Sequence, residues 1–257
     1  MPLLIGAILF VLGAIIASFI GVVAGRLNTG QGFLTGRSRC DACGAELLPV
    51  ALIPVLSYFL LGGKALCCGA RLALLSPISE VLLGALFVGA YMSIGLIPAL
   101  ALFLFSLSVL LTLVLYDLAH QILPYPLLAV FVVASALTGF FLASSPSAFR
   151  YSLVVAFCIG LSLALIHFLS RGRAMGLADA PLAFALALLV GPVAISGFVF
   201  SFWIGAAIGI ALLLRRPAGS RMGIEVPFAP YLSAGFLLAY FTQWNLFALV
   251  AAAAVLH

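Results

Sequence analysis

The sequence carries very little charge. Of its 257 residues only 7% are charged, and six of these are acidic. This scarcity excludes an ordinary soluble domain, because the surface of such a domain needs many more charged groups. The net charge of +5 comes from basic residues scattered through short segments. Scattered charges do not form the clustered basic face that nucleic-acid binding requires, so no nucleic-acid partner is expected.

The sequence also lacks the pattern of a cleaved secretory signal. The first apolar run, residues 2–25, has no basic segment before it and no clear small-residue cleavage site after it. We therefore expect residues 1–25 to form the first transmembrane helix.

Apolar sequence dominates the chain. Hydrophobic residues make up 66% of it and the mean hydropathy is +1.39. Recurring apolar stretches of about 20 residues predict an all-α fold, a polytopic integral membrane helical bundle with about eight transmembrane helices in the lipid bilayer. The expected spans are residues 3–25, 76–94, 97–116, 126–143, 151–170, 180–194, 197–214 and 229–255.

The distribution of lysine and arginine predicts the orientation of these spans. With the N-terminus outside, only Arg150 falls on the outer side. The other ten basic residues fall on the opposite side, which the positive-inside rule makes cytoplasmic. They are Arg26, Arg37, Arg39, Lys64, Arg71, Arg171, Arg173, Arg215, Arg216 and Arg221.

Two stretches need separate interpretation. Residues 181–214 are apolar throughout and would form a helix about 50 Å long, which favours two short spans with a turn near 191–192 or 196–197. Residues 50–61 are too few to span and contain Pro54. We expect them to pack in, or lie against, a cytoplasmic subdomain formed by residues 26–75.

Two aspartates stand out at the ends of apolar runs. Asp117 follows the third expected span and Asp179 precedes the sixth, so one out-and-back excursion returns the chain to the same cytoplasmic side. Ionisable residues at membrane depth are costly and usually functional. Two carboxylates that share a site hold one proton between them, so one can activate a water while the other polarises a scissile carbonyl. The plainer alternative is that each aspartate caps a helix or pairs with a loop arginine.

The segments around both aspartates resemble a known family. Residues 117–124 read Asp-Leu-Ala-His-Gln-Ile-Leu-Pro, and residues 174–179 read Ala-Met-Gly-Leu-Ala-Asp. Together they resemble the type IV prepilin peptidases, bacterial leader peptidases of the GxGD aspartic class, whose second motif is Gly-Met-Gly-x-Gly-Asp. Alanine replaces two of that motif's glycines, at 174 and 178. Four further segments resemble the family in the same order along the chain: 18–27, 53–58, 76–80 and 225–232.

The resemblance implies a function. It implies that Asp117 and Asp179 are catalytic, with Gly176, Ala178 and Glu80 binding substrate or supporting the site. The substrates would be type IV prepilins or pseudopilins, cleaved at the cytoplasmic face of the bacterial inner membrane by residues 76–257. The family often also N-methylates the new terminus with S-adenosylmethionine, using the subdomain at 26–75.

The cysteines form a second constellation. Cys40 and Cys43 form one half of a zinc knuckle, and the family's second half is another Cys-x-x-Cys-Gly. Here Cys68 matches its last cysteine, Ala65 occupies the place of the third, and Cys67 lies two positions away. Four thiolates suit Zn²⁺, and a disulfide is the weaker interpretation in a reducing cytoplasm. The fifth cysteine, Cys158, is expected to be a packed core thiol.

Three other polar residues carry weaker hypotheses. His120 could lie one helical turn from Asp117, although a solvated loop histidine is the plainer interpretation. His167 is expected to be a packing or interfacial residue. Glu80 begins the second span, where a carboxylate favours the helix N-terminus.

Two rival classes remain. In a transporter, the acidic pair would bind a cation or relay protons. An intramembrane protease resembling presenilin would also fit Tyr116-Asp117, but that class carries a Pro-Ala-Leu near its last span. Residues 229–232 read Ala-Pro-Tyr-Leu instead.

Overall fold

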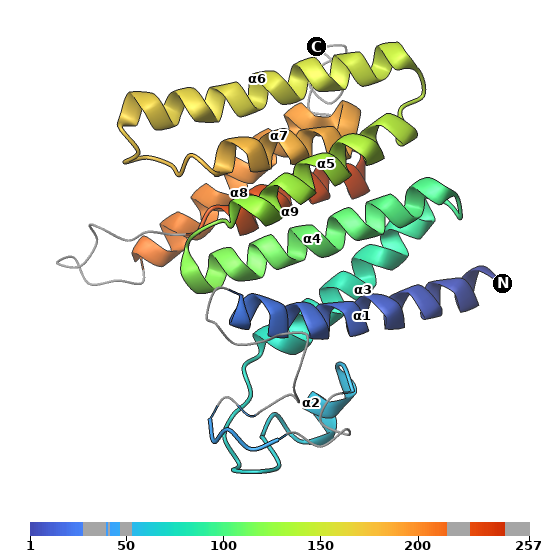
Figure 1. Cartoon of the computed structure of the whole chain (residues 1–257), viewed down its shortest axis with the longest axis vertical. Helices are drawn as coiled ribbons and strands as arrows, with labels where there is room; N and C mark the ends of the chain where they lie inside the picture. The colour runs from blue at the N-terminus through green and yellow to red at the C-terminus, as the bar shows by residue number, and fades with distance from the viewer. Residues whose placement is uncertain (28–39, 41, 47–52, 215–226, 245–257) are drawn as a thin grey trace, which may run out of the picture. The chain divides into compact units, whose positions relative to one another are not determined.

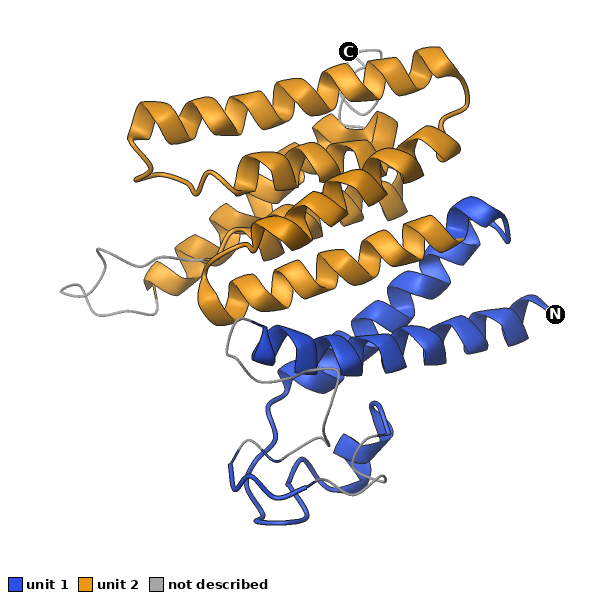
Figure 2. Cartoon of the chain, viewed as in Figure 1, with its two compact units in different colours: residues 1–100 blue, residues 101–257 orange. Residues whose placement is uncertain are grey.

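The computed structural model describes residues 1–27, 40, 42–46, 53–214 and 227–244. Within these residues the chain is mainly helical, and its β-structure is limited to isolated bridges such as that between Lys64 and Arg71. It divides into two compact units, residues 1–100 and 101–257 (Figures 1 and 2). The helices are α1 (Pro2–Arg26), α2 (Leu56–Leu60), α3 (Leu75–Ile94), α4 (Pro98–His120), α5 (Tyr125–Leu142), α6 (Pro146–Ser170), α7 (Asp179–Val190), η2 (Gly191–Val193), α8 (Ala194–Leu214) and α9 (Ala229–Thr242).

The helical bundle confirms the predicted fold class, but the number of spans differs. In the described residues six helical stretches are long and apolar enough to cross a membrane, with residues 179–214 counted as one stretch. Helix α7 has 12 residues and is about 18 Å long, too short to cross alone. Helix α9 ends at Thr242, and residues 245–255 of the expected last span lie outside the described residues. The chain is thus a multi-pass membrane protein, and its described residues contain six stretches of spanning length, while the expected last span lies partly outside them.

The first unit is built on α1 and α3. These helices approach closely because each contributes a glycine to the contact. A Cβ on Gly13 would lie 2.8 Å from the Cα of Gly84, and a Cβ on Gly84 would lie 2.8 Å from the carbonyl oxygen of Phe10. Such contacts between small residues are the usual way in which helices pack inside a membrane.

The short helix α2 belongs to the same unit. None of its residues is buried, and the side chains of Leu56, Phe59 and Leu60 are exposed. The described part of residues 50–61 therefore does not form the core of a subdomain. Residues 50–52 lie outside the described residues.

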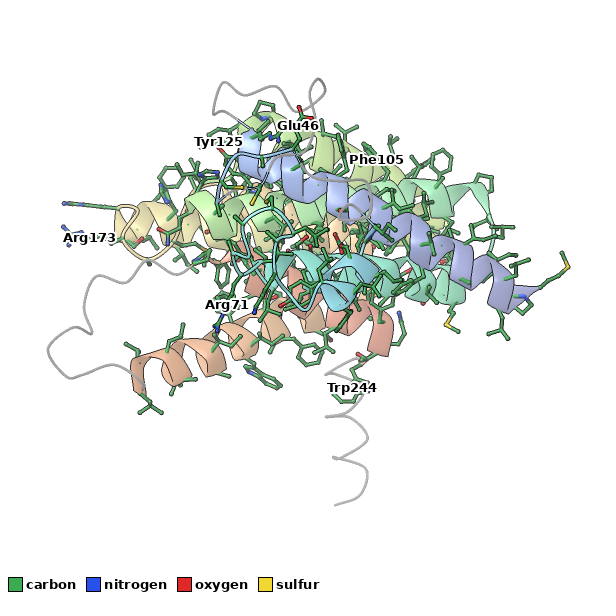
Figure 3. The ribbon with its side chains drawn as sticks, turned by 90° about the horizontal axis from the view of Figure 1, so that it is seen from below. Glu46, Arg71, Phe105, Tyr125, Arg173 and Trp244 are labelled. Atoms are coloured by element: carbon green, nitrogen blue, oxygen red, sulfur yellow. The ribbon has the colours of Figure 1, made fainter. Side chains whose placement is uncertain are left out.

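Helix α7 is the centre of the second unit. It packs against α5, α6, α8 and α9, and ten of its residues are buried. Its neighbours come close through glycines: a Cβ on Gly139 of α5 would lie 2.6 Å from the carbonyl oxygen of Leu188, and one on Gly160 of α6 would lie 3.2 Å from Phe184. By contrast, large apolar side chains such as Phe105 point outward from the bundle (Figure 3).

The turn expected within residues 181–214 occurs at Gly191. This residue has φ +63°, a backbone conformation that glycine adopts without strain. The chain then passes through η2, and α8 runs back toward the end of the bundle where α7 begins (Figure 1). The expected topological arginines at 37, 39, 215, 216 and 221 lie outside the described residues.

Candidate active site

Asp117 lies in the last turn of α4 and is buried, with 6% of its surface exposed. The backbone N–H of Ala229 donates a hydrogen bond to its Oδ2 at 3.2 Å. Ala229 is the first residue of α9, so its N–H has no acceptor within its own helix. The positive end of that helix thus faces the carboxylate, which favours a negative charge there.

Asp179 begins α7 and is also buried, with 8% of its surface exposed. Its carboxylate accepts a backbone hydrogen bond from Gly176 and interacts electrostatically with Asp117. The two aspartates predicted from the sequence are therefore within electrostatic range of each other, although 62 positions separate them in the chain (179 minus 117). A pair of interacting buried carboxylates can share a proton, which is the requirement for general acid–base chemistry by two aspartates.

The loop that leads to Asp179 is held by the end of α6. Arg171 has φ +54° and ends this helix in the left-handed conformation. The Nδ1–H of His167 donates to the carbonyl of Met175 at 2.8 Å, and the N–H of Ala174 donates to Ser170 Oγ at 3.2 Å. His167 is thus more than a packing residue, because it bonds to the loop four residues before Asp179.

Gly176 and Ala178, the predicted supporting residues, lie in this loop. A Cβ on Gly176 would lie 3.4 Å from Asp179 Oδ2, so a side chain there would stand directly against the carboxylate. Ala178 is half-buried and precedes α7, and its carbonyl accepts from the N–H of Leu182 at 3.3 Å. Ala174, the other departure from the family motif, is exposed.

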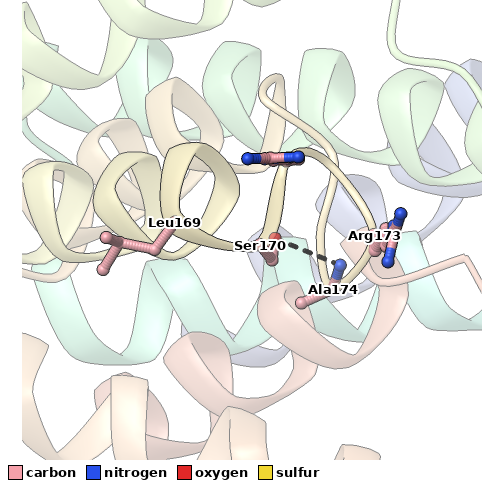
Figure 4. Close-up of a pocket in the computed structure, with 5 residues that line it drawn as sticks. Leu169, Ser170, Arg173 and Ala174 are labelled. Carbon is pink, nitrogen blue, oxygen red and sulfur yellow. Dashed lines mark hydrogen bonds between the residues drawn. The ribbon is translucent and has the colours of Figure 1, made fainter.

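Beside the loop lies an open pocket of about 520 Å³, lined by Leu169, Ser170, Arg171, Arg173 and Ala174 (Figure 4). It contains two arginines, and Arg173 extends beyond the end of the bundle in Figure 3. Neither aspartate lines this pocket. His120, the other polar candidate, is exposed and packs against Tyr116 with ring centres 4.4 Å apart.

Glu80 belongs to the first unit, where it is 5% exposed. Its Oε2 accepts the N–H of Val55 at 2.7 Å, and its Oε1 accepts the hydroxyl of Ser76 at 3.4 Å. Val55 has φ +62° and ψ −55°, a strained conformation for a β-branched residue. Glu80 therefore holds a strained turn in the Ile-Pro-Val segment against α3, which supports the subdomain.

The four predicted cysteine ligands lie together in the first unit. The sulfur atoms of Cys40, Cys43, Cys67 and Cys68 are all within 4.8 Å of one another. The Cys40–Cys68, Cys43–Cys67 and Cys67–Cys68 pairs are 3.8, 3.3 and 3.9 Å apart. A tetrahedral Zn²⁺ with bonds of about 2.3 Å separates its sulfur ligands by about 3.8 Å. The donor set and its spacing therefore fit a metal ion.

The protonation of the thiols supports the same conclusion. Backbone hydrogen bonds from Cys43 and Ala42 lower the pKa of Cys40 to about 7. Hydrogen bonds with Cys43 and Cys40 raise the pKa of Cys67 to about 12. Four thiols this close cannot all ionise without a cation, so they share protons where a metal would supply positive charge.

Cys158 was expected to be a packed core thiol, but this prediction is wrong. Its side chain is exposed on α6. Helix α6 buries a different face, through Ser152, Ala156 and Ile159, so Cys158 points away from the bundle. An apolar thiol is tolerated on the outside of a spanning helix because the surrounding medium is also apolar.

Two functional groups were not identified from the sequence. The N–H of Ala229 was missed because backbone donors leave no mark in residue types, although the Val-Pro-Phe-Ala-Pro segment was recognised. The loop contact of His167 was missed because it depends on how the chain turns after α6. A left-handed helix end at Arg171-Gly172 is the local signal that brings the chain back toward His167.

Comparison with known proteins places the chain in a family. A family model described as "Bacterial Peptidase A24 N-terminal domain" matches residues 11–94. The chain is 30% identical to the prepilin leader peptidase/N-methyltransferase of Bacillus subtilis, over 91% of this chain and 93% of the relative. The protein of the same name from Myxococcus xanthus is 32% identical over 85% of this chain and 66% of its own length. The corresponding protein from Pseudomonas aeruginosa is 30% identical over 76% of this chain and 68% of its own length.

No solved structure matches significantly. The chain therefore belongs to the prepilin leader peptidase/N-methyltransferase family.

Proposed function

We propose that the chain is a membrane aspartic endopeptidase that removes the leader peptide of type IV prepilins or pseudopilins. The observation that carries the proposal is the pair of buried, interacting carboxylates of Asp117 and Asp179 in a second unit that is otherwise almost free of acidic groups. The substrate class comes from the relatives' name, prepilin leader peptidase/N-methyltransferase. No feature of the site or of the relatives favours a transporter.

The two carboxylates would work as a pair. The ionised one takes a proton from a water molecule, and the oxygen of that water attacks the scissile carbonyl. The protonated one donates a hydrogen bond to the carbonyl oxygen, where negative charge develops. Collapse of the tetrahedral intermediate then breaks the C–N bond, and the leaving amine takes a proton from the pair. The backbone donors at Ala229 and Gly176 hold the two carboxylates in place throughout.

We propose that this chemistry takes place at the cytoplasmic face of the bacterial inner membrane. Asp117 lies in the last turn of α4 and Asp179 begins α7, with the α5–α6 hairpin between them. The basic residues of the connecting segments, including Arg171 and Arg173 beside the site, favour the cytoplasm for this end of the helices. A prepilin with a basic leader before an apolar helix would present its cleavage site at the same level.

We further propose that the cysteine cluster holds a structural Zn²⁺ that stabilises the subdomain. A subdomain with an exposed apolar helix has little core of its own, and a metal would supply folding free energy instead. N-methylation with S-adenosylmethionine is proposed from the relatives' name alone. No described residue is assigned to that cofactor, so no step of methyl transfer is derived.

The test is co-expression with a prepilin, followed by mass measurement of its new N-terminus. The wild-type chain should remove the leader, and an additional 14 Da (roughly one methylene, as each methyl replaces a hydrogen) would report methylation. Asp117→Asn and Asp179→Asn should each abolish cleavage while the protein still inserts at normal levels, because an amide cannot take the proton of the attacking water. Full cleavage by either variant would end the aspartyl mechanism.

A further inference from the structure

The two cysteine-bearing loops of the first unit have the same backbone fold. In the first loop the N–H of Cys40 donates to the carbonyl of Ala45, and the N–H of Gly44 donates to the carbonyl of Cys40, both at 2.8 Å. In the second loop the N–H of Ala65 donates to the carbonyl of Ala70, and the N–H of Gly69 donates to that of Ala65, again both at 2.8 Å.

These hydrogen bonds set the correspondence between the loops. Ala65 occupies the position of Cys40, and both residues are buried, with 5% and 7% of their surfaces exposed. Cys68 occupies the position of Cys43. The following glycines, Gly44 and Gly69, have φ values of +73° and +68°.

Cys67 therefore corresponds to Ala42, a position that carries no ligand in the first loop. Its sulfur nevertheless lies in the cluster, 3.3 Å from that of Cys43 and 3.9 Å from that of Cys68. The second loop thus has the same backbone hydrogen bonds as the first. Its first cysteine, however, is the third residue of the loop instead of the first. The four sulfur atoms remain close enough for one tetrahedral ion.

We propose that the metal site of this chain takes its fourth ligand from Cys67, as a replacement displaced by two residues from the position that Ala65 now holds. This inference rests on the proposed zinc site and specifies which residues build it. The ion is held by one standard knuckle and one knuckle in which adjacent cysteines both coordinate. Because the two loops share a backbone, a thiol returned to position 65 should reach the ion as the thiol of Cys40 does.

The experiment is a ligand exchange between positions 65 and 67 in the full chain, purified in detergent. Four proteins are compared: wild type, Cys67→Ser, the double variant Ala65→Cys with Cys67→Ser, and Cys158→Ser. The last is a matched control that removes one exposed thiol outside the cluster. Zinc content is measured by elemental analysis, affinity by competition with a chromophoric chelator, and the number of thiolate ligands from the absorption spectrum of the Co²⁺-substituted protein.

Wild type and Cys158→Ser should bind one ion with a four-thiolate cobalt spectrum. Cys67→Ser should bind zinc at least about tenfold more weakly than wild type. Loss of a group that only orients a metal ligand lowers metal affinity by about tenfold or more, and loss of the ligand itself should lower it at least as much. The cobalt spectrum of Cys67→Ser should lose thiolate character. The double variant should recover the four-thiolate spectrum and an affinity close to that of wild type.

The outcomes separate the two levels of the argument. A wild-type protein without affinity for zinc would overturn the zinc site itself. If wild type binds zinc and Cys67→Ser keeps its affinity and spectrum, the zinc site stands and the assignment of Cys67 is overturned. If the double variant does not recover the spectrum, the equivalence of Ala65 with Cys40 is overturned. Recovery by the double variant also excludes general misfolding as the reason for metal loss in Cys67→Ser.

Discussion

Buried carboxylates need hydrogen-bond donors, and Asp117 and Asp179 obtain theirs from the backbone. Ala229 and Gly176 supply backbone N–H groups, which every substitution except proline leaves in place. The substitution of Ala for Gly at 174 and 178 is compatible with this arrangement. Position 174 is exposed and position 178 is half-buried, whereas the retained Gly176 is the one whose Cβ would meet the Asp179 carboxylate.

The contact between His167 and Met175 leads to a prediction about positioning. His167→Ala removes the hydrogen bond that holds the loop before Asp179. A hydrogen bond of this kind contributes about 1 kcal/mol, so we expect prepilin cleavage to slow by about fivefold to tenfold. The loss should appear in kcat more than in KM, because the substituted residue acts through the loop.

The matched control is Leu165→Ala, which shortens an exposed side chain on the same helix. It should cleave at the wild-type rate. Equal rates for His167→Ala and Leu165→Ala would show that the loop contact has no influence on the site.

The cysteine cluster leads to a prediction about pH. The raised pKa of Cys67, about 12, means that this thiol keeps its proton at neutral pH until a metal displaces it. Zinc binding should therefore release protons, and its affinity should fall as pH is lowered, by about tenfold per pH unit for each proton released. Calorimetry in two buffers of different ionisation enthalpy measures the number of protons. Binding without proton release at pH values of about 6 to 8, well below the raised pKa of Cys67, would contradict the protonation described for this thiol.

At the scale of elements, the packing of α8 against α9 controls the position of Ala229. A Cβ on Gly235 would overlap the backbone nitrogen of Ser201. Ser201 in turn donates its hydroxyl hydrogen bond to the carbonyls of Gly197 and Leu232, at 2.8 and 2.9 Å. Gly235→Ala should therefore push the helices apart and cost about 1–3 kcal/mol of stability. Because α9 also carries the donor to Asp117, cleavage should fall as well.

Gly209→Ala on α8 is the control for this prediction. No atom lies within 4 Å of a Cβ at Gly209, and alanine favours a helix over glycine by up to about 1 kcal/mol. Thermal unfolding in detergent should show a lower midpoint for Gly235→Ala and an unchanged or higher one for Gly209→Ala. The same midpoint for both variants would contradict the close contact between α8 and α9.

Helix α7 illustrates how an element can be apolar and still too short to cross the membrane. Its alternation of alanine and leucine suits burial on all sides, and α5, α6, α8 and α9 surround it. An apolar run is equally compatible with a lipid-facing span and with a buried central helix. For this reason hydropathy predicted two short spans in residues 181–214, where the structure has a short, buried central helix, a turn at Gly191 and a longer helix.

At the scale of the whole molecule, the proposed orientation can be tested by labelling. Ala174→Cys places a thiol in the exposed loop before Asp179, and Ser144→Cys places one at the exposed α5–α6 connection, the other end of the hairpin. A membrane-impermeant maleimide added to intact cells should label the Ser144→Cys variant more than wild type, and the Ala174→Cys variant no more than wild type. The thiol at position 174 should react only after permeabilisation. Labelling of position 174 in intact cells would reverse the orientation.

The chain forms two compact units, residues 1–100 and 101–257. The cysteine cluster and Glu80 belong to the first unit, and both aspartates with their backbone donors belong to the second. The domain boundaries expected from the sequence, near residues 25 and 75, divide the chain by proposed function. The compact units divide it by packing, so the expected boundaries remain predictions.

The sequence by itself determined the helical class, the positions of most helices and the two aspartates at the same end of a hairpin. It could do so because lipid forces every spanning segment to satisfy its own backbone, so hydropathy reports helices directly. The tertiary structure decided which atoms each functional group contacts. The N–H of Ala229 reaches Asp117 from 112 residues away, and the sulfur of Cys67, a ligand predicted from the sequence although two positions from the family's third cysteine, is brought next to the other three. Such contacts depend on how helices and loops pack in space, and residue spacing along the chain does not contain that information.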